Sequence, residues 1–214
     1  MPIDTFISFF GISVLLALAP GPDNIFVLLQ SALYGVRVGF CIVLGLCTGL
    51  IFHTLLVTLG VATLLKTSPT AFFILKLIGA AYLLYLAYLT AKSKLMTLPR
   101  EEKTEISGNT MSLWQYYRRG IFMNATNPKV TLFFLAFLPQ FVYSNSISVT
   151  QQLISLSAIF MLATFLTFNA IALFSGYFGR LIKHSPKAQR WLNIITVIVF
   201  IGLAVKLLWG SLPA

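Results

Sequence analysis

Six long apolar segments occupy most of this chain, and they restrict its fold more than any other feature. A spanning helix needs roughly 20 mostly apolar residues to cross about 30 Å of hydrocarbon. The segments lie at 5–33, 39–64, 72–91, 120–141, 153–174 and 192–209. Only helices and closed barrels satisfy their backbone polar groups in lipid, and strand alternation is missing. We therefore expect an all-α polytopic membrane protein with six transmembrane helices in a lipid bilayer.

The charged residues lie mainly between these segments. Only 9% of the residues are charged, yet the formal net charge is +10, which in a soluble protein would suggest a nucleic-acid partner. Membrane proteins instead concentrate Lys and Arg in their cytoplasmic loops. Eleven of the 15 basic residues fall in the first, third and fifth loops, and only Lys66 falls on the other side. We expect no nucleic-acid partner, and both termini on the outer, periplasmic side of the inner (plasma) membrane.

A polar linker at 92–119 divides the segments three and three. Because each half then has an odd number of spans, two related halves would have inverted topologies. We expect one membrane domain over 1–214, with a first half at 1–91, a cytoplasmic linker at 92–119 and a second half at 120–214. The predicted fold is thus a three-plus-three inverted repeat, and two runs of residues predict that helices 1 and 4 are broken.

The first run interrupts the first segment and consists of Pro20, Gly21, Pro22, Asp23 and Asn24. A proline lacks an N–H group and clashes with the carbonyl four residues earlier, so the carbonyls of Leu16 and Leu18 lose their helical partners. A second half-helix can start with Pro22 in its first turn. The N–H groups of residues 23–25 would then be free at an electropositive helix end.

The second run lies in the fourth segment and includes Asn124, Asn127, Pro128 and Lys129. Asn127 can serve as the N-cap of a half-helix that starts at Pro128. Pro128 releases the carbonyl of Asn124, and the two amide side chains can satisfy exposed backbone or a ligand. At 1.5 Å per residue, Asp23 and Lys129 both lie roughly 15 Å from the cytoplasmic surface, near the bilayer midplane.

Discontinuous helices that meet at mid-membrane are typical of the binding sites of secondary transporters. Asp23 is the only acid within a segment and Lys129 the only base near the centre of one, and an unpaired charge there costs several kcal/mol. We predict that both runs bind substrate. Asp23 would contact an ammonium or carry a proton, while Lys129 and the helix N-termini would receive a carboxylate. A structural ion pair between Asp23 and Lys129 is the alternative.

Other segments carry candidates for a proton relay or a cavity lining. His53 could relay protons near neutral pH or be a hydrogen-bonded structural imidazole. Asn169 could line a cavity or join two helices by polar packing. Gly45 and Gly49 form a GxxxG pair, which predicts close approach of another helix. That helix could belong to the same chain or to a second subunit, so a homodimer stays open.

Taken together, the residues resemble the LysE/RhtB family of lysine, homoserine and threonine exporters. The resemblance covers nearly the whole chain and rests on the Pro20 to Asp23 run, the Gly-rich second segment, the polar linker, the run at 124–129, Phe133-Phe134 and Pro139-Gln140-Phe141. It implies six helices and an antiporter that exports amino acids or their derivatives, driven by the proton gradient. One acid opposed by one base favours a neutral amino acid such as threonine or homoserine over lysine, and a homoserine lactone or leucine is also compatible.

Two other classes of protein are alternatives to such an exporter. A membrane-embedded enzyme would need a nucleophile with its base, or a cluster of metal ligands. The chain has two histidines far apart, His53 and His184, and no second acid within a segment. We therefore expect no enzyme, and neither catalytic residues, nor a metal, nor a cofactor. A passive channel is the remaining alternative, because the two breaks could line a pore.

Overall fold

The protein is an assembly of helices in the computed structural model, which describes residues 2–61, 68–92, 111–143, 147–175 and 186–209. Within these ranges, four continuous helices are long and apolar enough to cross a membrane: Val36–Gly60, Thr70–Lys92, Val149–Leu173 and Arg190–Trp209. Two bent pairs pass the same test when each pair is counted as one broken span: Ile3–Leu18 with Pro22–Tyr34 (66°) and Leu113–Ala125 with Pro128–Phe141 (48°). The predicted all-helical polytopic fold, with the first and fourth spans broken, is confirmed.

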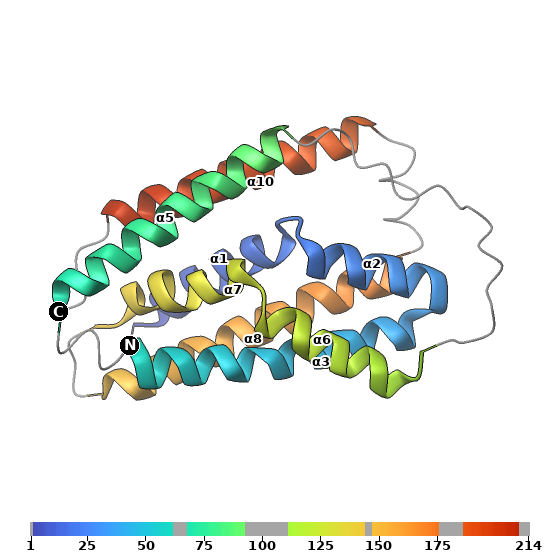
Figure 1. Ribbon diagram of the computed structural model, residues 1–214, viewed down its shortest axis with the longest axis horizontal. Helices are drawn as coiled ribbons and strands as arrows, with labels where there is room; N and C mark the ends of the chain where they lie inside the picture. The colour runs from blue at the N-terminus through green and yellow to red at the C-terminus, as the bar shows by residue number, and fades with distance from the viewer. Residues whose placement is uncertain (1, 62–67, 93–110, 144–146, 176–185, 210–214) are drawn as a thin grey trace.

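The described elements follow one another in chain order (Figure 1): α1 (Ile3–Leu18), α2 (Pro22–Tyr34), α3 (Val36–Leu55), the π-helical turn η1 (Leu56–Val61), α5 (Pro69–Lys92), α6 (Leu113–Ala125), α7 (Pro128–Leu132), the π-helical turn η2 (Phe133–Phe137), the 3-10 turn η3 (Leu138–Phe141), α8 (Val149–Leu173) and α10 (Pro186–Trp209). Spans one and four are thus α1–α2 and α6–α7 with η2 and η3. The other four spans correspond to α3 with η1, α5, α8 and α10.

The fourth span begins earlier than predicted, at Leu113 instead of residue 120. Ser112 and Gln115 form a capping box: the hydroxyl accepts from the Gln115 N–H (3.3 Å), and the Gln115 side chain accepts from the Ser112 N–H (2.7 Å). This arrangement satisfies two N–H groups that a helix start would otherwise leave free. The end of the predicted linker at 92–119 is therefore helical. Its residues 93–110 lie outside the described ranges, as do the orientation-setting residues Lys66 and Arg180.

Several helix contacts of the first half have a counterpart in the second half. α3 packs against α6, and α1 packs against α8. If each span of the first half corresponds to the span three places later, these two pairs are equivalent. α3 with α8 and α5 with α10 are then pairs across the symmetry axis, and both pairs are in contact. These contacts are compatible with the predicted inverted three-plus-three repeat, which stays a prediction together with the residue limits of its halves.

The GxxxG pair of α3 packs within the chain, against α6. A Cβ atom on Gly45 would overlap the carbonyl of Tyr117 and lie 3.1 Å from the Cα of Gly120. A Cβ atom on Gly49 would lie 2.8 Å from the Cβ of Asn124. The absence of side chains therefore lets the two backbones approach closely. This contact fixes α3 against the end of α6 at which the fourth span breaks.

Two apolar clusters lie on either side of the helix breaks. The phenylalanine cluster is built from α1, the end of α3, η1, α5, α7, η2, η3, the first half of α8 and α10, and it includes Phe9, Phe133, Phe137, Phe141 and Phe160. The second cluster is built from α2, α3, α6 and the end of α8, and it includes Val27, Ile42, Leu46, Tyr116 and Phe168. Because α1 and α2 belong to different clusters, as do α6 and α7, both breaks lie between the two clusters.

Candidate functional site

The two helix breaks meet, close to the middle of the long axis of the molecule (Figure 1). Lys129 Nζ donates to the carbonyls of Leu16 (3.3 Å) and Ala19 (3.1 Å), which lie at the end of α1 and in the first break. Asn127 Nδ2 donates to Asp23 Oδ2 at 2.7 Å. Three hydrogen bonds therefore join residues that are more than 100 positions apart in the chain. The structure thus brings together the two runs that the sequence singled out.

Side chains replace helical hydrogen bonds that are lost at the first break. The carbonyl of Leu16, which was predicted to lose its partner, accepts from the Lys129 ammonium. The carbonyl of Ala17 accepts from Asn24 Nδ2 at 2.6 Å. A buried carbonyl without a partner would cost about 1–3 kcal/mol, so these side chains stabilise the broken helix.

The N-terminus of α2 opens into the break without a side-chain cap. Its N-cap is Gly21, in an extended conformation. Of the three N–H groups predicted to be free, that of Ile25 donates to the Gly21 carbonyl (3.1 Å), which leaves those of Asp23 and Asn24. A Cβ atom on Gly21 would lie 3.3 Å from Lys129 Nζ, so the glycine lets the ammonium approach. This helix end is electropositive and suited to an anionic group.

The second break is arranged as predicted from its residue types. Asn127 is the N-cap of α7, its Oδ1 accepts from the Lys129 N–H at 3.0 Å, and Pro128 is the first helical residue. The carbonyl of Asn124, which Pro128 releases, lies 2.9 Å from His53 Nε2 on α3. The break is thus held from α3 as well as from within its own span.

Four buried polar atoms around the breaks lack a hydrogen-bond partner among the described residues: Asp23 Oδ1, Asn24 Oδ1, Asn124 Oδ1 and His53 Nδ1. Asp23 is only 3% exposed, so solvent does not satisfy its carboxylate from outside. The three oxygens are acceptors, one of them on a carboxylate and two on amides. Such a set is suited to a ligand that brings several N–H donors, as an ammonium group does.

Asp23 and Lys129 take different partners instead of forming the direct ion pair that was the alternative. The carboxylate accepts from Asn127, whereas the ammonium donates to two backbone carbonyls. An ammonium has three N–H donors, so one donor of Lys129 is left for another acceptor. The two side chains are therefore neighbours at one site, and each keeps capacity for a further partner.

The side chain of Asn169 forms its hydrogen bond within its own helix and not with either break. Its Nδ2 donates to the carbonyl of Phe165 one turn earlier (2.8 Å), and the residue is half-buried. Thr164 on the same helix is 2% exposed, and its hydroxyl has no partner among the described residues. It lies one turn from Phe160 and one turn from Phe168, which belong to opposite clusters. Thr164 therefore lies between the two clusters, as the breaks do. The sequence alone does not distinguish this position from that of Asn169.

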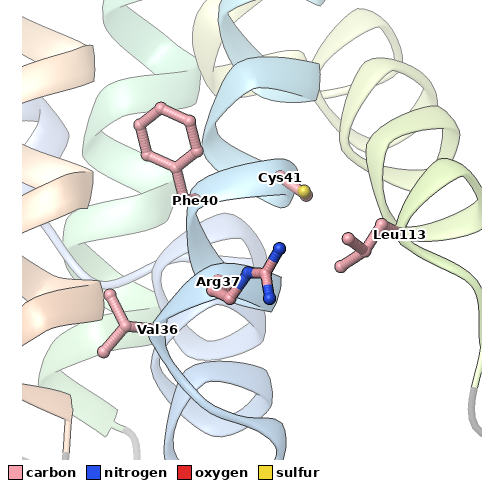
Figure 2. A pocket seen from close by; sticks show the side chains of 5 residues that line it. All are labelled: Val36, Arg37, Phe40, Cys41 and Leu113. Atoms are coloured by element: carbon pink, nitrogen blue, oxygen red, sulfur yellow. The ribbon is translucent and has the colours of Figure 1, made fainter.

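A surface pocket of about 380 Å³ lies away from the breaks, where α3 and α6 begin (Figure 2). It is lined by Val36, Arg37, Phe40, Cys41 and Leu113. None of these side chains carries a carboxylate or an amide, so the pocket has no strong acceptor for an ammonium group. The breaks are the better candidate site for a zwitterion.

Comparison with known proteins decides the family. The model of the LysE type translocator family matches residues 14–211, a range that includes both breaks. The chain belongs to the LysE type translocator family. This translocator is 30% identical over 204 residues to an uncharacterized membrane protein of Bacillus subtilis (strain 168), with 94% of this chain and 96% of the relative covered.

Other relatives of the translocator are similarly distant. It is 32% identical over 204 residues to an uncharacterized membrane protein of Pseudomonas aeruginosa, with 93% of this chain and 92% of the relative covered. It is 29% identical over 195 residues to the leucine efflux protein of Klebsiella pneumoniae, with 91% and 90% covered. No solved structure matches the chain.

The assignment confirms the resemblance to LysE-type exporters and makes the chain a multi-pass membrane transporter. The family is of the transporter type. Within the described ranges, no group of three or more His, Cys, Asp or Glu side chains is placed to hold a metal ion.

Proposed function

We propose that this translocator exports a small neutral amino acid across the inner membrane and that the substrate binds where the two breaks meet. The contact between the two breaks carries the proposal, because it buries one carboxylate and one ammonium at a single site. The leucine efflux protein among the relatives supports amino acids as the substrate class. In the predicted orientation, α2 and α6 reach the cytoplasmic side and both termini face outward.

Each charged group of a zwitterion has a complementary partner at the breaks. The substrate ammonium donates to Asp23 Oδ1, with the amide oxygens of Asn24 and Asn124 as further acceptors. The substrate carboxylate approaches the uncapped N-terminus of α2 and the remaining donor of Lys129. In an α-amino acid the two groups are on the same carbon, so neighbouring acceptors and donors are what such a substrate requires.

The charges at the site favour a substrate without a charged side chain. Asp23 is the only acid in the described spans beyond the first turn of α1, so a second ammonium, as in lysine, has no partner. Threonine and homoserine are the substrates we propose, and the unpartnered hydroxyl of Thr164 supports a hydroxylated side chain. Leucine is the alternative, favoured by the leucine efflux relative and by the apolar clusters on both sides.

Proton coupling follows from the burial of Asp23. An isolated carboxylate in an apolar interior is costly, so it requires either a cation or a proton. The substrate ammonium satisfies it during export, and a proton bound at Oδ1 satisfies it when the substrate has left. The empty carrier then returns in the protonated form, which exchanges one substrate for one proton.

An efflux screen tests this function. Cells that contain or lack the translocator are loaded with threonine, homoserine, leucine, lysine and dipeptides, and the release of each amino acid is followed with and without a protonophore. We expect faster release of neutral amino acids than of lysine, against a gradient, with loss of the effect when the protonophore is added. Release that occurs only down the gradient and ignores the protonophore would indicate a passive channel. Equal release from both kinds of cell would refute export.

A further inference from the structure

We infer that His53 is a positioning residue of the substrate site. In this inference its Nε2–H group holds the carbonyl that Pro128 releases from helix α6, and so fixes Asn127 against Asp23. The inference rests on the proposed function, because it concerns the geometry of the same site. It chooses between the two roles that the sequence left open for this histidine.

The imidazole makes a defined hydrogen bond in a closed environment. His53 is 0% exposed, and its Nε2 lies 2.9 Å from the carbonyl oxygen of Asn124. A carbonyl only accepts, so Nε2 must carry the hydrogen. Gly49 lies one turn before His53 on α3, and its lack of a side chain lets Asn124 approach the α3 backbone. This close approach holds Asn124 beside the imidazole. The bond therefore replaces the helical one that proline removes.

The effect of this bond reaches Asp23 through Asn127. The carbonyl that His53 holds also accepts from the backbone N–H of Asn127 at 2.9 Å. The side chain of Asn127 accepts from the Lys129 N–H at 3.0 Å and donates to Asp23 Oδ2 at 2.7 Å. Asn127 is thus held at its backbone and at both ends of its amide. Releasing the Asn124 carbonyl would move the group that orients the Asp23 carboxylate.

The other ring nitrogen is poorly placed to pass a proton. Nδ1 has no hydrogen-bond partner among the described residues. The ring packs against Phe52 and Phe134, with centroids 5.6 Å away in both cases, and phenylalanine offers no proton acceptor. A relay needs a donor or acceptor at each nitrogen, whereas positioning needs only the Nε2–H group.

Two matched substitutions test the inference. The amide nitrogen of glutamine is as many bonds from Cα as His53 Nε2, whereas that of asparagine corresponds to Nδ1. H53Q therefore keeps the donor at the Asn124 carbonyl, and H53N removes it. We expect H53Q to retain near wild-type kcat/KM and the wild-type pH profile in proteoliposomes. H53N should lower kcat/KM about tenfold, because the buried Asn124 carbonyl loses one of its two donors and no longer holds Asn127 firmly against Asp23.

Each outcome decides for or against positioning. Loss of transport in H53Q, or a changed pH profile, would overturn the inference in favour of a proton relay, and wild-type transport in H53N would also overturn it. A double-mutant cycle of H53N and N127A, measured by melting temperature in detergent, gives a readout without transport. Non-additive effects support the inference and additive effects contradict it. If the wild-type protein moves no amino acid, the proposed function fails, and this cycle still decides the role of His53.

Discussion

Replacing Asp23 by Asn is expected to reduce transport about a hundredfold, since removing one partner of a buried charge pair costs about 2–5 kcal/mol. The introduced asparagine can still accept the hydrogen bond from Asn127 through its side-chain oxygen, so the contact between the two breaks survives. What the variant loses is the negative charge at the unpartnered Oδ1, where we place the substrate ammonium or a proton. Initial rates of counterflow in proteoliposomes measure the effect.

Asp4 provides the matched control for this substitution. It is exposed in the first turn of α1, so Asp4→Asn removes the same charge far from the breaks and should leave transport unchanged. A third variant, Asp23→Glu, keeps the charge but displaces it by one methylene, and we expect intermediate transport. If Asp23→Asn transported within a few-fold of wild type while remaining folded, Asp23 would be neither the ammonium partner nor the proton carrier.

Replacing Gly45 by Ala is expected to destabilise the protein by about 3 kcal/mol or more. The added methyl group would overlap the backbone carbonyl of Tyr117 and approach the Cα of Gly120, and backbone atoms cannot move aside as a flexible side chain can. α3 and α6 would have to separate, and the second break would lose its support from His53. Folded yield and melting temperature in mild detergent measure this loss.

Gly202 is the matched control for the helix contact. It lies within α10, and a Cβ atom there would meet no atom within 4 Å. Gly202→Ala should therefore have wild-type stability, or slightly more, because alanine favours the helix by up to about 1 kcal/mol. A Gly45→Ala protein with unchanged melting temperature would show that the backbones of α3 and α6 are not in close contact.

The sequence predicted the spans well because one physical quantity determines them. Apolar length identifies a membrane helix without knowledge of its neighbours, and the two proline-containing runs disrupt helices for local reasons. The start of the fourth span was missed, although Ser112 and Gln115 carry the spacing of a capping box. The capping-box signal was overlooked because the charged residues at 92–119 resemble those of a linker.

The contacts between elements could not be predicted in the same way. Gly45 packs against α6, and the Lys129 ammonium donates to carbonyls of the first break. Both contacts depend on how the two halves are rotated against each other. For the same reason the sequence did not show that Asn169 bonds back to its own helix, whereas the buried hydroxyl of Thr164 has no partner among the described residues. Residue type suggests the chemistry that we propose for the site, and only the packing shows which partners each group takes.

The central claim is that an amino acid binds between the two broken helices. An experimental structure of the protein with its exported amino acid tests this most directly. We expect the substrate nitrogen within hydrogen-bond distance of Asp23 Oδ1 and the substrate carboxylate at the N-terminus of α2. A substrate bound elsewhere, for example in the pocket beside Arg37, with no contact to either break, would contradict the account.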